Sequence, residues 1–186
     1  MSWRERLQEI RDTPWQPVST AALAAASVPI VLVLWLAHTG ERWVWLLDNA
    51  NLALHEAGHP LAGLVSERLA VYGGTLGQLA FPVAATASFW MRRHPASFAL
   101  CAAWIGENLF NVAVYMADAR AMQLPLVGGL DPALAHDWNE IFSRWGVLPW
   151  DVTIAYAVRF AGWAVILAAW GWLAWRCWQD REEGGA

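Results

Sequence analysis

Long apolar stretches separated by short polar segments make up most of this chain. Four of them are long enough to cross the roughly 30 Å hydrocarbon core of a bilayer as helices: residues 20–37, 43–71, 96–120 and 151–175. In the second stretch Asp48, Asn51 or Asn49, His55 and His59 recur at helical spacing, which predicts one polar stripe on an apolar helix. The pattern predicts an all-α integral membrane protein with about 4–5 transmembrane helices.

Two regions between these stretches need a different interpretation. Three glycines and a proline fall within residues 72–82 and interrupt helicity there, so residues 73–90 form either a further span or a re-entrant segment. Residues 122–137 have the composition of a loop. Asp137 and Glu140 have capping-box spacing, which predicts a short interfacial helix that ends near Gly146.

The chain divides into three parts by polarity: a polar N-terminal segment over 1–19, one membrane-embedded domain over 20–176, and a charged tail over 177–186. The arginines of the first segment favour a cytoplasmic N-terminus, in a bacterial inner (cytoplasmic) membrane. Five full spans would then put Arg92 and Arg93 outside, against the positive-inside rule, and the re-entrant alternative removes this conflict.

Composition supports the membrane assignment and limits the partners. Hydrophobic residues make up 58% of the chain and charged residues 15%, and the 15 tryptophans suit membrane–water boundaries. The net charge of −4 and the scattered arginines argue against nucleic acid as a partner. The two cysteines have no C-x-x-C spacing, which argues against a disulfide framework or a thiolate zinc site.

Residues 55–59 read His-Glu-Ala-Gly-His, a complete H-E-x-x-H zinc-hydrolase motif. Four residues apart on a helix, the two histidines share a face and can bind one metal ion. Ionisable groups are costly inside an apolar helix unless they have a function. The motif therefore predicts Zn²⁺ bound by His55 and His59, with Glu56 as the general base that activates water.

A catalytic zinc site usually has three protein ligands, and three residues compete for the third position. Glu107 is about as far into its helix as His55 is into its own, so parallel helices would bring the two level. His136 is the more usual zinc ligand but needs its loop to fold back over the metal. Asp118 would lie roughly 10 Å from the histidines along the axis. Glu107 is the predicted ligand, and the other two remain alternatives.

Further polar residues of the 96–120 helix share the face of Glu107. Asn108, Asn111 and Tyr115 lie on or next to this face, where they could orient a substrate or stabilise an oxyanion. Each of them could instead form a hydrogen bond between helices.

The His-Glu-Ala-Gly-His pentad in a membrane helix, followed by a glycine-rich segment and a later polar helix, resembles the site-2 protease family of intramembrane zinc metalloproteases. The resemblance covers about residues 43–120. It implies the same roles for the two histidines and Glu56, and a membrane-spanning segment of another protein as substrate. The family's third ligand is an aspartate followed by glycine, whereas alanine follows Asp118 and Pro132 follows Asp131.

These inferences predict a membrane-embedded zinc metallopeptidase that hydrolyses peptide bonds in or near the membrane. Its partners would be the lipid bilayer and a membrane protein or peptide substrate. The alternative is a metal-binding membrane protein without proteolytic activity, either an inactive scaffold or chaperone, or a metal transporter. The intact Glu56 argues against a scaffold, and a transporter would need several metal sites where the sequence offers one.

Overall fold

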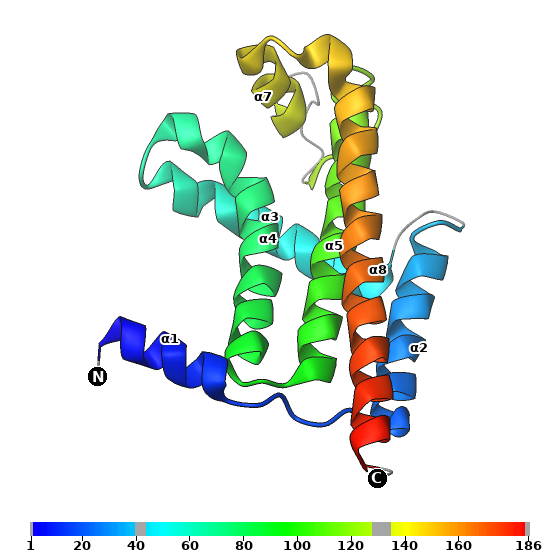
Figure 1. Cartoon of the computed structure of the whole chain (residues 1–186). Coiled ribbons are helices and arrows are strands. Elements are labelled where there is room, and N and C mark those ends of the chain that lie inside the picture. Colours follow the sequence, from blue (N-terminus) through cyan, green and yellow to red (C-terminus); the bar gives the residue numbers. More distant parts are fainter. Residues whose placement is uncertain (1, 40–43, 128–134, 185–186) are drawn as a thin grey trace.

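The computed structural model describes residues 2–39, 44–127 and 135–184, and all regular structure in these ranges is helical (Figure 1). The predicted all-α class is thus confirmed. The helices within the described residues are α1 (Trp3–Asp12), α2 (Thr20–Leu36), α3 (Trp45–Gly63), α4 (Glu67–Met91), α5 (Pro95–Ala117), α7 (Asp137–Trp145), the 3₁₀ turn η2 (Leu148–Trp150) and α8 (Asp151–Gly184).

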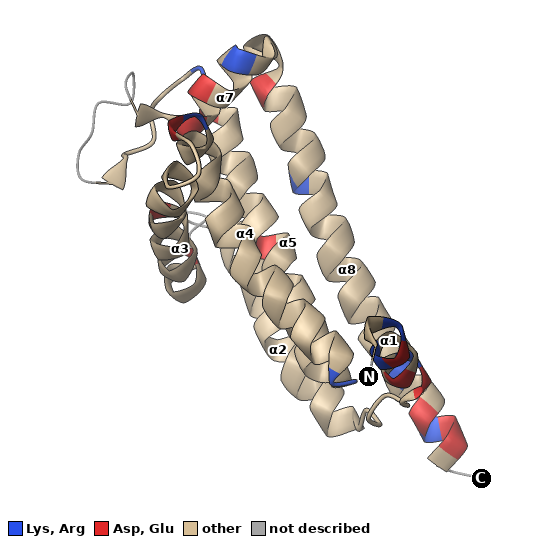
Figure 2. Ribbon diagram, turned by 90° about the vertical axis from the view of Figure 1, so that its left-hand side faces the viewer, with Lys and Arg blue, Asp and Glu red and all other residues tan. Residues whose placement is uncertain are grey.

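Helices α5 and α8 pack along each other and form the centre of the molecule, with α2 against both (Figures 1 and 2). Gly106 and Gly162 bring the two backbones into contact, because a Cβ on either would overlap a carbonyl oxygen of the other helix. Residues Pro95–Ala117 and Leu148–Gly184 are long and apolar enough to cross a membrane, and α2 is apolar but shorter.

Helix α3, which carries the two histidines, is shorter than the single helix expected over residues 43–71. It ends at Gly63, shortly after Pro60, and a turn leads to α4, whose N-cap Ser66 accepts a hydrogen bond from the Arg68 amide. In Figure 1, α3 runs obliquely across the other long helices. Helix α3 is therefore not parallel to α5. The expected match in depth between His55 and Glu107 required the two helices to be parallel.

The glycine-rich segment is not a break or an irregular re-entrant loop, because α4 is helical throughout from Glu67 to Met91. The expected interruption was wrong. Gly73 and Gly77 instead face Gly58 of α3, where a Cβ on any of the three would overlap the opposite backbone. The glycines thus let two helices cross at backbone contact.

Both ends of the chain lie at the same end of the molecule (Figure 1). The Arg93 side chain donates a hydrogen bond to the Ile10 carbonyl oxygen, and the Val18 amide donates one to Asp180. The expected charged tail is helical up to Gly184 as the last part of α8.

The short helix predicted before Gly146 is confirmed as α7, and Gly146 ends it with a left-handed φ of 69°. Its N-cap is His136, whose Nδ1 accepts a hydrogen bond from the Asn139 amide, and not Asp137 as the capping-box spacing suggested. Buried Trp138 and Phe142 fix α7 against the end of α5. Asp137 is therefore the first helical residue, and its side chain is not used in capping.

Candidate metal centre

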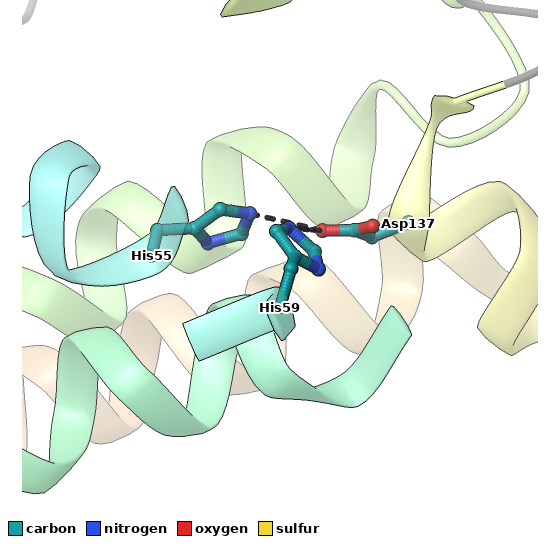
Figure 3. Close-up of side chains that lie close together, drawn as sticks. All are labelled: His55, His59 and Asp137. Carbon is teal, nitrogen blue, oxygen red and sulfur yellow. Dashed lines mark hydrogen bonds and ion pairs between the residues drawn. The ribbon is translucent and has the colours of Figure 1, made fainter. Parts of the chain in front are cut away.

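The two histidines of α3 and the aspartate at the start of α7 point at one another (Figure 3). His55 Nε2 lies 2.9 Å from Asp137 Oδ2, and His59 Nε2 lies 3.3 Å from the same oxygen. His55 and Asp137 are buried and His59 is partly buried. These three side chains can hold a metal ion, since one ligand atom from each lies within 4.8 Å of the others.

The other ring nitrogen of each histidine faces a carbonyl oxygen. His55 Nδ1 lies 2.8 Å from Gln78 Oε1, and His59 Nδ1 lies 2.8 Å from the backbone oxygen of Ala70. A carbonyl oxygen only accepts hydrogen bonds, so each Nδ1 carries the hydrogen. Each Nε2 is then a lone-pair donor directed at the carboxylate. Metal-ligating histidines are held in the same way by partners on their second nitrogen.

The electrostatics of this group favour a bound cation. With both Nδ1 atoms protonated, the two Nε2 atoms and the carboxylate converge, and their repulsion is removed by a positive charge between them, which either a metal ion or a proton on an imidazole supplies. Ligands on a tetrahedral zinc ion lie about 3.3 Å apart, because zinc bonds to nitrogen and oxygen are about 2.0–2.2 Å long. The two nitrogen–oxygen separations of 2.9 and 3.3 Å are near that value, and all three ligand atoms lie within 4.8 Å of one another, so the group is compact enough to surround an ion of this size.

The negative charge of the Asp137 carboxylate suits a ligand of a metal ion. Burial raises the pKa of its carboxyl group, but the contacts with His55 and His59 outweigh burial, and the pKa lies below its usual value. The carboxylate is therefore ionised at neutral pH. The Asp137 amide donates a hydrogen bond to the Tyr115 hydroxyl oxygen at 3.1 Å, which fixes the start of α7 against α5.

A cavity of about 440 Å³ opens beside the two histidines' helix, and Glu56 lines it next to His55. Glu56 is exposed, in contrast to buried His55. Most of the other lining side chains are apolar and come from α3, α5 and residues 124–127; they include Leu52, Phe110, Val114, Leu124, Pro125, Leu126 and Val127. Three further charged residues line the cavity: Asp48 of α3, Glu107 of α5 and Arg159 of α8. A water molecule or peptide in this cavity would be within reach of Glu56.

The structure brings Asp137 to the histidine pair in place of the three residues weighed from the sequence. Glu107 is buried and accepts a hydrogen bond from Asn51 Nδ2 at 2.8 Å. Asp118 accepts hydrogen bonds from the amides of Gln123 and Leu124. The oblique course of α3 accounts for the difference, because equal depth along α3 and α5 does not bring two residues level when the helices cross.

His136 is next to the site in sequence but faces away from it. Its Nε2 lies 3.3 Å from Asp118 Oδ2, and its ring lies against Tyr115 with the centroids 4.3 Å apart. Burial lowers the pKa of His136 below its usual value, since the nearby carboxylate only partly offsets the loss of water. His136 thus lies beside Asp118 and Tyr115 and is not part of the His55, His59 and Asp137 group.

The three residues expected to support a substrate have different positions. Tyr115 and Asn111 line the cavity, and Asn111 Nδ2 donates to Asp48 Oδ1 at 2.9 Å. Asn108 is fully buried and bonds to other side chains. Sequence reasoning missed Asp137 because its spacing to Glu140 was assigned to capping. It missed Gln78 as well, although a glutamine in an apolar stretch is a usable signal.

Comparison of the chain with protein-family models, curated proteins and solved structures finds no match.

Proposed function

We propose that this protein is a membrane-embedded zinc metallopeptidase that hydrolyses peptide bonds in or near the membrane. The observation that carries the proposal is the convergence of His55 Nε2, His59 Nε2 and the Asp137 carboxylate beside a cavity lined by Glu56. The site-2 protease family, which the motif resembles, uses an aspartate as its third ligand, and Asp137 supplies that residue type. The length and apolar character of α5 and α8 support a membrane location.

Each of these residues has a distinct role in the proposed hydrolysis. His55, His59 and Asp137 would hold the metal ion, and zinc bound there supplies Lewis-acid polarisation of a water molecule and of the scissile carbonyl group. Glu56 takes a proton from the water as its oxygen bonds to the carbonyl carbon, and delivers that proton to the nitrogen as the C–N bond breaks. Tyr115 also lines the cavity, where its hydroxyl group can donate a hydrogen bond to the carbonyl oxygen.

The cavity also indicates what kind of substrate fits. Most of the side chains that line it from α3, α5 and residues 124–127 are apolar, which suits the apolar residues of a membrane segment. A helical segment must unwind before hydrolysis, because its carbonyl groups are held in backbone hydrogen bonds.

Replacement of Glu56 by glutamine tests the catalytic assignment. Glutamine keeps the size of the side chain but cannot accept the proton, so cleavage of a library of quenched-fluorescence apolar peptides should fall at least about 100-fold. Zinc content should not change, because Glu56 is not a ligand. Glu67→Gln, on an exposed glutamate at the start of α4, is the matched control and should leave both unchanged.

Two results would contradict the proposal. One is cleavage by Glu56→Gln at the wild-type rate. The other is stoichiometric zinc with no cleavage of any peptide by the wild-type protein, which would favour a metal-binding protein without proteolytic activity.

A further inference from the structure

A row of polar side chains leads from His55 through the apolar interior to Glu107. His55 Nδ1 lies 2.8 Å from Gln78 Oε1, and Gln78 Nε2 donates to Asn108 Oδ1 at 3.2 Å. Asn108 Nδ2 donates to Asn51 Oδ1 at 3.0 Å, and Asn51 Nδ2 donates to Glu107 Oε2 at 2.8 Å. Four hydrogen bonds thus connect three helices, because the residues come from α3, α4 and α5.

All four bonds point in the same direction. Each amide accepts a hydrogen bond on the side of His55 and donates one on the side of Glu107. The Glu107 end sets this direction, since the oxygen that faces Asn51 Nδ2 accepts its hydrogen bond. Reversal would bring the Asn51 oxygen against the Glu107 oxygen, so that two acceptors face each other, and it would place the Asn51 amino group against the Trp104 Nε1–H, so that two donors face each other. Aligned hydrogen bonds polarise one another, so the effect of the carboxyl group reaches the imidazole.

The side chains of this row are almost completely buried, which restricts their positions and their hydrogen-bond partners. Gln78 is 3% exposed, Asn51 1%, Glu107 2% and Asn108 0%. Polar groups buried to this extent destabilise a protein unless they are hydrogen-bonded, and here each amide uses both its oxygen and its nitrogen. Trp104 Nε1 donates a second hydrogen bond to Asn51 Oδ1 at 2.9 Å. Glu107 also contacts the carboxyl group of Asp48.

His59 has no such connection. In the part of the chain that the structure describes, its Nδ1 faces only the backbone oxygen of Ala70. The two histidines of the motif are therefore held differently, one by the backbone of α4 and the other by a row of side chains that ends at a carboxyl group.

We propose that Gln78, Asn108, Asn51 and Glu107 form a relay of hydrogen bonds that positions His55, fixes the hydrogen on its Nδ1 and makes its Nε2 a stronger ligand. Glu107 then acts on the metal site through the relay, as a positioning residue and not as a ligand. The inference deepens the proposed function, because it rests on the same metal site. It also accounts for the polar stripe of α3, since Asn51 lies one turn before His55.

The first test is the zinc affinity of variants of the full chain in detergent, measured by competition with a chelator. Gln78→Leu removes the acceptor for His55 and should weaken zinc binding about 10- to 100-fold. Gln78→Glu keeps an acceptor at that position and should restore most of the affinity. Glu107→Gln should weaken binding by a smaller factor, because Glu107 is four hydrogen bonds away.

Ser27→Ala is the matched control. It removes a hydrogen bond between two other helices, from Trp170 Nε1 to Ser27 Oγ at 2.8 Å, and should leave zinc affinity unchanged. Equal zinc affinity of Gln78→Leu and wild type would overturn the relay while leaving the proposed function intact.

The second test does not depend on zinc. In protein labelled with ¹⁵N-histidine, the Nδ1–H proton of His55 should give a downfield resonance with slow solvent exchange. The resonance should be lost in Gln78→Leu, shift upfield in Glu107→Gln and stay in place in Ser27→Ala. A wild-type protein that binds no zinc would count against the proposed function, and this resonance would still decide the relay: identical spectra for the wild type, Gln78→Leu and Glu107→Gln would overturn it.

Discussion

Asp137 is the residue on which the candidate metal site depends most, because among the described residues it is the one that joins α7 to the histidines of α3. Its carboxylate faces both Nε2 atoms, and its amide is bonded to Tyr115. The carboxylate thus completes a set of two nitrogens and one oxygen, a ligand set typical of catalytic zinc.

Replacement of Asp137 by asparagine should abolish tight zinc binding. The amide is neutral and a poor zinc ligand, so zinc affinity should fall by more than about 100-fold. This loss is larger than the one expected when a group that only hydrogen-bonds to a ligand is removed. Asp118→Asn is the matched control, since Asp118 bonds to the amides of Gln123 and Leu124, and it should bind zinc within about threefold of wild type. Chelator competition measures both, and the opposite ranking of the two variants would show that Asp118 is the ligand.

The sequence alone was sufficient to predict the part of the site whose residues are close together along the chain. The spacing of His55 and His59 puts them on one face of any helix, so their pairing needed no knowledge of the fold. Asp137 is 82 residues from His55 along the chain, and its position depends on how α7 docks. That docking is set by packing of Trp138 and Phe142, which no spacing rule reveals.

Among the helices, the crossing of α3 and α4 determines where the histidines lie. Gly58 faces Gly73 and Gly77 at backbone contact, and Gly74 lies directly against the imidazole of His55. A Cβ on Gly74 would overlap the ring atoms of His55. Helix α4 thus packs against α3 and also forms one wall of the candidate metal site.

Gly74→Ala should therefore displace His55 and reduce zinc content, even though Gly74 contributes no ligand. Gly171→Ala in α8 is the control, because a Cβ there meets nothing within 4 Å. Since alanine favours a helix over glycine by about 1 kcal/mol, the control should keep its zinc and unfold at an equal or slightly higher temperature. Zinc content and thermal unfolding of the two purified variants check this, and full zinc in Gly74→Ala would contradict the packing.

Helix positions were largely predictable, and helix directions were not. The apolar stretch over residues 96–120 corresponds to α5, and residues 151–175 lie within α8, because apolar length is read directly from sequence. The glycines of α4 were taken for a break, since their low helix propensity is a local property. Their actual role is a contact with Gly58, which depends on the fold.

For the whole molecule, the arginines are distributed unevenly between the two ends. One end carries both termini and the turn between α4 and α5, and seven arginines belong to its segments: Arg4, Arg6, Arg11, Arg92, Arg93, Arg176 and Arg181. The end with α7 has Arg68, Arg120 and Arg144. For a membrane crossed by α5 and α8, the positive-inside rule predicts that the first end faces the cytoplasm. In this predicted orientation Arg92 and Arg93 would lie inside together with the N-terminus, without any re-entrant loop.

This orientation predicts which positions a membrane-impermeant maleimide reaches in intact cells. In a background with Cys101 and Cys177 replaced by serine, Ser143→Cys on α7 should be labelled from outside, because Ser143 is exposed. Glu183→Cys, near the end of α8, should be labelled only after permeabilisation. Labelling of Glu183→Cys in intact cells, with Ser143→Cys protected, would reverse the orientation.

The zinc content of the detergent-purified full chain, measured by mass spectrometry of the metal beside His59→Ala, tests the central claim most directly. The arrangement of His55, His59 and Asp137 predicts about one zinc ion per chain in the wild type, and none in the variant, which lacks one of three ligands. Wild-type protein without zinc after loading, or a variant that keeps it, would contradict a metal centre formed by these residues.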